Sequence, residues 1–254
     1  MIKNEIKLLK KPRLKKPVLI EGLPGFGLVG RLAAEHLVKQ LKAVKFAEFY
    51  SPGFPPQVKI LPDGTVSMHK AEFYYSKQKK KDLIILLGDD QAATIEWQYS
   101  VCGDIIEFAR KNNTSMIITL GGYGVRGIPK KPRVFGAATD KSLIKTFSKH
   151  GALFGKVGGD IIGAAGLLIG IGALRGIPGV CLMGETHGSY VDPKAASSVL
   201  KVLTSYLGLK ISFKELDEKA KEIEKMIKRI EEVQKTQQAT IPKPPSHEPL
   251  TYIR

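Results

Sequence analysis

Cysteine, long apolar runs and aromatic residues are all scarce in this sequence of 254 residues. Its two cysteines, Cys102 and Cys181, exclude a disulfide framework, argue against a cysteine metal site and favour a reducing cytoplasmic setting. The longest apolar stretch, Ile161–Leu174, has 14 residues, too few to cross a bilayer as a helix. Glu21 and Pro24 interrupt the apolar run behind the basic first residues, so we expect neither a signal peptide nor a membrane partner.

Positive charge is abundant, with a formal net charge of +16. The Lys and Arg residues are spread over three clusters: residues 1–17, then Lys77 with Lys79–Lys81, then Arg126, Lys130, Lys131 and Arg133. Aromatic residues that could stack on bases do not alternate with these clusters, and no RNA- or DNA-binding motif is present. The pattern therefore favours solvated faces and an acidic protein partner over a nucleic acid.

The sequence is organised around Pro17–Lys39, in which an apolar run, Val18–Ile20, precedes closely spaced glycines. Leucines then recur at helical spacing, which predicts a strand, a tight turn and a helix. Further apolar or aromatic runs predict the strands Ala43–Tyr50, Gln57–Leu61, Thr65–Tyr75, Asp82–Gly88, Ser115–Leu120, Val134–Ala138 and Gly179–Met183. Predicted helices lie between them, at Thr94–Arg110, Asp140–Ser148, within Gly155–Leu174, and between an Asp192 cap and Gly208. This alternation predicts an α/β fold.

Pro62-Asp63-Gly64 separates two of these strand-like runs, which is a strong hairpin signal. We expect this β-rich insertion to add antiparallel strands to the sheet.

The α/β domain is expected to span residues 1–209 and to be followed by a different kind of helix over residues 210–236. Its apolar residues alternate steps of four and three: Leu216, Ala220, Ile223, Ile227 and Ile230. Lys214–Lys235 carries seven basic and seven acidic residues, so its outer face is balanced. This heptad seam is short for a free coiled coil. It is compatible both with a helix packed along its own domain and with a self-association element.

Residues 237–254 are expected to form a flexible arm, because Pro242, Pro244, Pro245 and Pro249 oppose regular structure. The arm ends in Leu250–Arg254, which is unusually apolar and aromatic. Either this is a frayed terminus, or it is a peptide anchor that docks in a pocket of another protein.

The glycine turn matches a dinucleotide-binding fingerprint, with Gly25, Gly27 and Gly30 after a strand and at the start of a helix. Glu48 follows at about the distance of an acidic residue that holds a ribose. The motif is weak when it stands alone. We favour a turn whose glycines allow the helix to pack closely on the sheet.

An acid–base set is also conceivable at the predicted carboxyl ends of the strands. It comprises Asp89, Asp90, Glu185 and His187, with Tyr123 nearby. Nothing in the sequence fixes their mutual geometry, and neither a nucleophile elbow nor a Walker loop is present. A nucleotide- or nucleoside-binding enzyme that uses the Gly25–Gly30 loop is therefore the alternative to a binding protein.

Several motifs, in order, resemble the proteasome assembly chaperone family and its archaeal homologues in particular. They are GLPGFGLVG at Gly22–Gly30, GGYGVRG at Gly121–Gly127, GLLIGIG at Gly166–Gly172 and CLMGETHGSYVDPKAA at Cys181–Ala196. The resemblance covers about residues 17–209. It implies a three-layer α/β/α sandwich with a phosphorylase-like mixed sheet, no catalysis, and neither a cofactor nor a metal.

The same resemblance implies binding to the α subunits of the proteasome core particle. It also implies a homo-oligomer, a tetramer as in the most similar archaeal homologues, and a role in assembling or activating the particle without ATP. Proteasome activators commonly end in a hydrophobic residue, Tyr and any residue. Here Tyr252, Ile253 and Arg254 resemble that ending with a shift of one position, and they are the expected partner-binding residues.

Overall fold

The computed structural model describes residues 3–240. Its main sheet has the strand order β1-β3-β6-β7-β2-β8-β10-β9. The strands are β1 (Glu5–Leu8), β2 (Val18–Gly22), β3 (Val44–Tyr50), β6 (Ala71–Ser76), β7 (Leu83–Gly88), β8 (Met116–Gly124), β9 (Val134–Ala138) and β10 (Gly179–Thr186). The helices are α1 (Val29–Gln40), α2 (Ile95–Lys111), α3 (Lys141–Ser148), α4 (Ala164–Leu174), α5 (Pro193–Leu207) and α6 (Lys214–Thr240), and a 3-10 turn spans Phe26–Leu28.

The sheet is mixed. Its centre, β7-β2-β8-β10, is parallel, and the outer strands β6, β3, β1 and β9 are antiparallel to their neighbours. Strand β2 is buried along its whole length because it has a parallel partner on each side and helices on both faces. The predicted strand–turn–helix unit therefore lies in the middle of the sheet.

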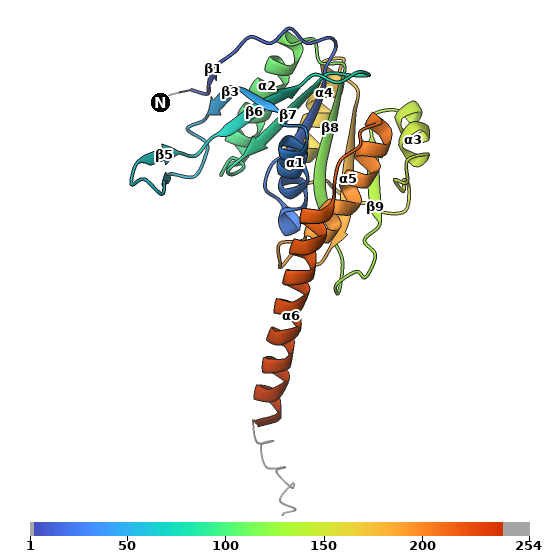
Figure 1. Cartoon of the computed structure of the whole chain (residues 1–254). Helices are drawn as coiled ribbons and strands as arrows, with labels where there is room; N and C mark the ends of the chain where they lie inside the picture. Colours follow the sequence, from blue (N-terminus) through green and yellow to red (C-terminus); the bar gives the residue numbers. More distant parts are fainter. Residues whose placement is uncertain (1–2, 241–254) are drawn as a thin grey trace, which may run out of the picture.

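Helices cover both faces of the sheet (Figure 1). Helices α1, α3 and α5 share one apolar core with Val18 and Ile20 of β2. Helices α2 and α4 share the other core with Leu19. This arrangement confirms the expected three-layer α/β/α architecture.

The ends of the predicted helices rest on local chemistry. Asp140 and Asp192 cap α3 and α5 by accepting backbone N–H bonds, and Gly208 ends α5 in a left-handed conformation with φ of 67°. Thr94 caps α2 in the same way as the two aspartates. Among residues 3–240, no helix combines the length and the apolar character that crossing a bilayer requires.

The structure differs from the sequence-based predictions in several β segments, and strand β1 was not predicted. Strands β4 (Val58–Ile60) and β5 (Val66–Met68) form the predicted hairpin, but they pair only with each other as a separate two-stranded sheet. Of β4, β5 and β6, only β6 joins the main sheet, where it pairs with β3 and β7. Gly121–Gly124, which lie beyond the predicted strand Ser115–Leu120, continue β8 beside β10.

Helix α6 is longer than predicted and runs to Thr240, so that residues 237–240 of the expected arm are helical. Tyr252, Ile253 and Arg254 lie outside the described residues.

Candidate functional site

Segments far apart in the sequence meet at the carboxyl ends of β2, β8 and β10. The amide of Asp192 donates to the carbonyl oxygen of Gly27 at 2.8 Å, which ties the segment after β10 to the glycine turn. The amide of Val125 donates to the carbonyl oxygen of Thr186 at 2.9 Å, which joins the segment after β8 to β10. Three of the motifs quoted above therefore build one edge of the molecule.

The glycine turn serves packing. A Cβ on Gly30 would collide with the carbonyl oxygen of Leu120 in β8, and a Cβ on Gly22 would collide with Ala34 in α1. Only glycine allows α1 to approach the sheet so closely. This geometry supports the packing interpretation of the fingerprint.

Glu48, the candidate ribose ligand, is engaged by two lysines. Its Oε1 accepts hydrogen bonds from Lys70 at 2.6 Å and from Lys45 at 2.9 Å. Burial alone would raise the pKa of Glu48, but the hydrogen bonds from Lys70 and Lys45 lower that pKa to about 2. The carboxylate therefore belongs to an ion-pair network on the sheet.

The conceivable acid–base residues do not converge. Asp89 follows β7 and pairs with Lys59 and, at 3.9 Å, with Arg31, while Asp90 pairs with His69. Both aspartates thereby fasten the β4–β5 hairpin to the body. Strands β2 and β8 separate β7 from β10, which places Asp89 about 14 Å from Glu185 at the usual strand spacing.

Glu185 and His187 have local partners as well. Glu185 accepts hydrogen bonds from the backbone N–H of Arg133 at 2.9 Å and from its Nε at 3.0 Å. The Arg133 guanidinium lowers the pKa of Glu185 and keeps it ionised. The ring of His187 stacks on Tyr190 at a centroid distance of 5.9 Å. Glu185 thus holds the segment 125–133 in place.

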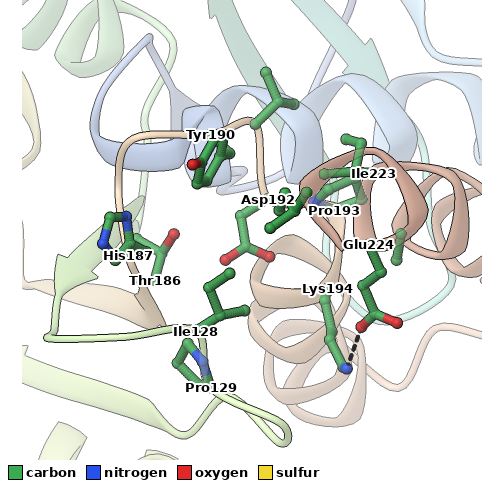
Figure 2. A pocket seen from close by; sticks show the side chains of 13 residues that line it. Ile128, Pro129, Thr186, His187, Tyr190, Asp192, Pro193, Lys194, Ile223 and Glu224 are labelled. Atoms are coloured by element: carbon green, nitrogen blue, oxygen red, sulfur yellow. Dashed lines mark hydrogen bonds and ion pairs between the residues drawn. The ribbon is translucent and has the colours of Figure 1, made fainter. Parts of the chain in front are cut away.

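Helix α6 begins against the body near this edge. The Nζ of Lys39 lies 2.7 Å from Oε2 of Glu215, and the Nζ of Lys194 lies 2.6 Å from Oε1 of Glu224. Figure 2 shows the second pair beside Ile223 and the loop residues Ile128 and Pro129. These two ion pairs join α6 to α1 and α5.

The apolar seam of α6 packs on this same surface. Leu216 and Ile227 are buried, and the crevice between α6 and the two loops has a volume of only about 30 Å³. Over Leu216–Ile227 the seam is thus covered by its own domain, as one of the two interpretations expected. Ile230 is 44% exposed, and from there α6 projects away from the body (Figure 1).

A basic loop borders the foot of α6. Arg126, Lys130 and Lys131 are exposed on the segment between β8 and β9, whose Ile128 and Pro129 contact the crevice. The foot of the projecting helix therefore offers positive charge to a partner.

Two further polar residues near this edge, the buried Glu21 and the half-buried Gln91, were not among the predicted site residues. The side chain of Gln91 donates to the carbonyl oxygen of Pro24 at 2.6 Å and accepts from the amide of Ala164 at 2.9 Å, which joins the glycine turn to α4. Glu21 is an acid within an apolar strand, and that anomaly was the available signal. Among residues 3–240, no group of three or more His, Cys, Asp or Glu side chains could hold a metal ion.

Comparisons with known proteins agree with this architecture. The model of the PAC2 family matches residues 19–231. Pyrococcus furiosus PbaB, an archaeal proteasome activator, has a structure similar to this one, with a TM-score of 0.87 and 44% identity, covering 91% of this chain and 100% of that one. Pyrococcus furiosus PbaA, an archaeal homolog of proteasome-assembly chaperone, is similar with a TM-score of 0.74 and 30% identity, covering 90% and 96% of the two chains.

A Methanocaldococcus jannaschii protein, MJ1210, is 44% identical over 241 residues, which is 94% of this chain and 93% of its own. The resemblance to archaeal proteasome assembly chaperones, inferred from the motifs, is thus confirmed at the level of sequence and of fold. The chain belongs to the PAC2 family.

Proposed function

We propose that this chain is a non-enzymatic, proteasome-binding protein that helps to assemble or activate the core particle without ATP. One observation carries the proposal: the chain matches the archaeal proteasome activator PbaB over that protein's whole length at 44% identity. The dispersed carboxylates agree with a binding role, because Asp89, Asp90 and Glu185 are each engaged in a structural contact.

We propose that α6 and residues 241–254 form the docking element, with Tyr252, Ile253 and Arg254 entering a pocket between α subunits. The shape of the molecule supports this. A helix of 27 residues extends about 40 Å, and its first turns are held by the Lys39–Glu215 and Lys194–Glu224 pairs. The rest of α6 projects away from the body (Figure 1).

The basic loop at the foot of α6 supplies a second contact in this proposal. Exposed Arg126, Lys130 and Lys131 would face an acidic surface of the core particle. Charges at the rim of an interface act mainly on the association rate, which falls as salt increases. We therefore expect binding to weaken in high salt even when residues 241–254 are intact.

We further propose that the chain forms a homo-oligomer, with a tetramer as the expected state. Helix α4 supports this because all its residues are apolar, although only one side of it faces the core. Leu174 at its end is 87% exposed, and Ile95 on the neighbouring helix α2 is 75% exposed. A helix that is apolar on all sides is normally covered on all sides. Several docking elements on one particle would add avidity.

Self-association can be measured by size-exclusion chromatography with light scattering. We expect Leu174→Asp combined with Ile95→Asp to reduce the mass of the particle. The matched control is Ile60→Asp, which changes an 80% exposed apolar residue on the β4–β5 hairpin. A monomeric wild type, or a double variant with the wild-type mass, would contradict the oligomer proposal.

The docking element can be tested by pull-down of purified archaeal core particle and of separate α subunits. Three chains are compared: the full chain, a chain ending at Thr240, and a full-length chain with Tyr252, Ile253 and Arg254 changed to Ala. We expect the full chain to bind and both altered chains to lose most binding. Equal binding by all three would move the contact to the body, and no binding by any of them would reject the proposed function.

A further inference from the structure

A second cavity lies apart from the foot of α6, on the face of the sheet that α2 and α4 cover. It is a cleft of about 720 Å³ at the carboxyl ends of β2, β8 and β10. Glu21, Leu120 and Cys181 form its floor, and Phe26, Tyr123 and Ile161 stand around it. Volumes of this order are typical of small-molecule sites. Neither the fold nor the proposed docking role requires such a cleft.

Glu21 is the unusual feature of the floor. It is 1% exposed, its Oε1 accepts the amide of Leu23 at 2.7 Å, and its Oε2 has no hydrogen-bond partner in the part of the chain that the structure describes. A buried polar atom left unpaired costs about 1–3 kcal/mol. Strand β2 is paired on both sides, so its backbone cannot turn the side chain away. A costly group held in place at the bottom of a cleft points to a ligand.

The charges around the cleft are acidic. Burial raises the pKa of Glu21 to about 8, against the smaller opposing effect of the nearby amides of Leu23 and Leu120. Burial, with a smaller contribution from Glu21, raises the pKa of the Cys102 and Cys181 thiols to about 12, so both are neutral. Asp160 stands at the mouth, and no Lys, Arg or His of residues 3–240 lines the cleft. The carboxylate of Asp160 at the mouth therefore disfavours anions.

We propose that the cleft binds a small organic cation, an amine whose ammonium group pairs with Oε2 of Glu21 while its apolar part packs on the walls. Asp160 attracts the cation at the mouth. Met183, a flexible side chain that lines the cleft and is 8% exposed, can shift to admit the ammonium group. On binding, the neutral carboxylic acid of Glu21 releases its proton to solvent. The resulting carboxylate forms an ion pair with the ammonium ion.

Calorimetry on the full chain tests this at about pH 7, with benzylamine as the probe and benzyl alcohol and benzoate as isosteres of different charge. We expect saturable binding of benzylamine alone. We also expect release of close to one proton per amine, measured in two buffers that differ in ionisation enthalpy. Equal binding of the alcohol or of benzoate would overturn the proposal. So would the absence of saturable binding by benzylamine, butylamine and agmatine.

Glu21→Gln is the decisive variant, because it keeps the shape and the Oε1 acceptor but cannot ionise. We expect it to lose roughly tenfold or more in benzylamine affinity, together with the proton release. Asp90→Asn, which lies at the hairpin, serves as the control and should bind like the wild type. Unchanged affinity in Glu21→Gln would reject the site.

A measurement on the wild type removes any dependence on how the variant folds. The side-chain carboxyl ¹³C resonance of Glu21 can be titrated with and without benzylamine. A bound cation should lower the pKa of Glu21 by about two units or more, as release of close to one proton at about pH 7 requires. An unchanged titration in the presence of saturating amine would overturn the proposal. Neither measurement involves the proteasome, so the cleft and the docking role succeed or fail separately.

Discussion

At the scale of single residues, the glycines of the turn after β2 have unequal duties. Gly30 lies against the carbonyl oxygen of Leu120, whereas a Cβ on Gly25 would meet open space. The fingerprint spacing therefore does not identify which glycine is required for packing. The atoms that surround each glycine in the structure identify it.

We predict that Gly30→Ala destabilises the fold by about 3 kcal/mol or prevents folding, because a backbone carbonyl cannot move aside as a flexible side chain can. Gly25 has an extended backbone, with φ of −161°, so Gly25→Ala should change the free energy of unfolding by less than about 1 kcal/mol. Denaturant unfolding of the two variants checks this. Similar losses in both would show that the turn has some other role.

Glu21 makes stability depend on pH. The pKa of its carboxyl is about 8 in the folded chain, against an ordinary value of 4.5. Between these values the folded state keeps a proton that the unfolded state releases, so the free energy of unfolding falls as pH rises from about 4.5 to about 8. The contribution reaches at most ~5 kcal/mol.

We therefore predict that Glu21→Gln gains stability relative to the wild type as pH rises from 5 to 8, and that the two chains differ least near pH 4. Thermal or denaturant unfolding across this range measures the difference. A constant difference between the two chains from pH 5 to 8 would contradict the raised pKa.

The roles of single residues were also the features least predictable from the sequence. Glu21 stood out only as an interruption of an apolar run. Its meaning depends on which face of β2 it occupies and on what covers that face. The role of Gln91 could not be predicted from the sequence either, because its partners Pro24 and Ala164 are distant in sequence. Conversely, the dispersal of Asp89 and Glu185 follows from strand order, which no local pattern encodes.

At the scale of elements, the sequence predicted most of the molecule. Apolar runs located the parallel strands, and Asp140, Asp192 and Gly208 marked helix ends with their own side chains or backbone conformation. The pairing of strands was harder to predict. The turn at Asp63-Gly64 predicts a hairpin, but the hairpin sequence does not indicate whether its strands join a larger sheet. Here they form a two-stranded sheet separate from the main one.

Helix α6 combines an anchored part with a projecting part, and its heptad seam explains only the first. We predict that Ile227→Ala, at a buried position, lowers the free energy of unfolding by about 2 kcal/mol and speeds amide exchange in α6. Met226→Ala, one position earlier and 63% exposed, is the matched control and should change little. Equal effects of the two variants would mean that the seam does not hold α6 on the body.

At the scale of the whole molecule, the described chain combines a compact α/β body with one projecting helix (Figure 1). The body displays a small-residue helix, α4, on one face and a basic loop at the foot of α6. In the proposed function the first serves self-association and the second serves docking. The cleft whose floor holds Glu21 borders α4 through Ala165 and has a proposed role separate from both.

The charge of the molecule leads to a whole-molecule prediction. If the basic loop faces an acidic surface, Lys130→Glu combined with Lys131→Glu should slow association with the core particle roughly tenfold at low salt. Lys10→Glu combined with Lys11→Glu, two exposed changes near β1 that alter net charge by the same amount, is the matched control. Surface plasmon resonance gives both rates, and an unchanged association rate in the double variant would exclude the loop from the interface.

The most direct test of the central claim is chemical cross-linking of the full chain to purified archaeal core particle, with the linked peptides identified by mass spectrometry. The account predicts links from Lys235 and Lys243 to α subunits, with few or none from the outer faces of α2 and α4. A chain that forms no complex with the core particle, or one whose links to it come only from the body, would contradict the account.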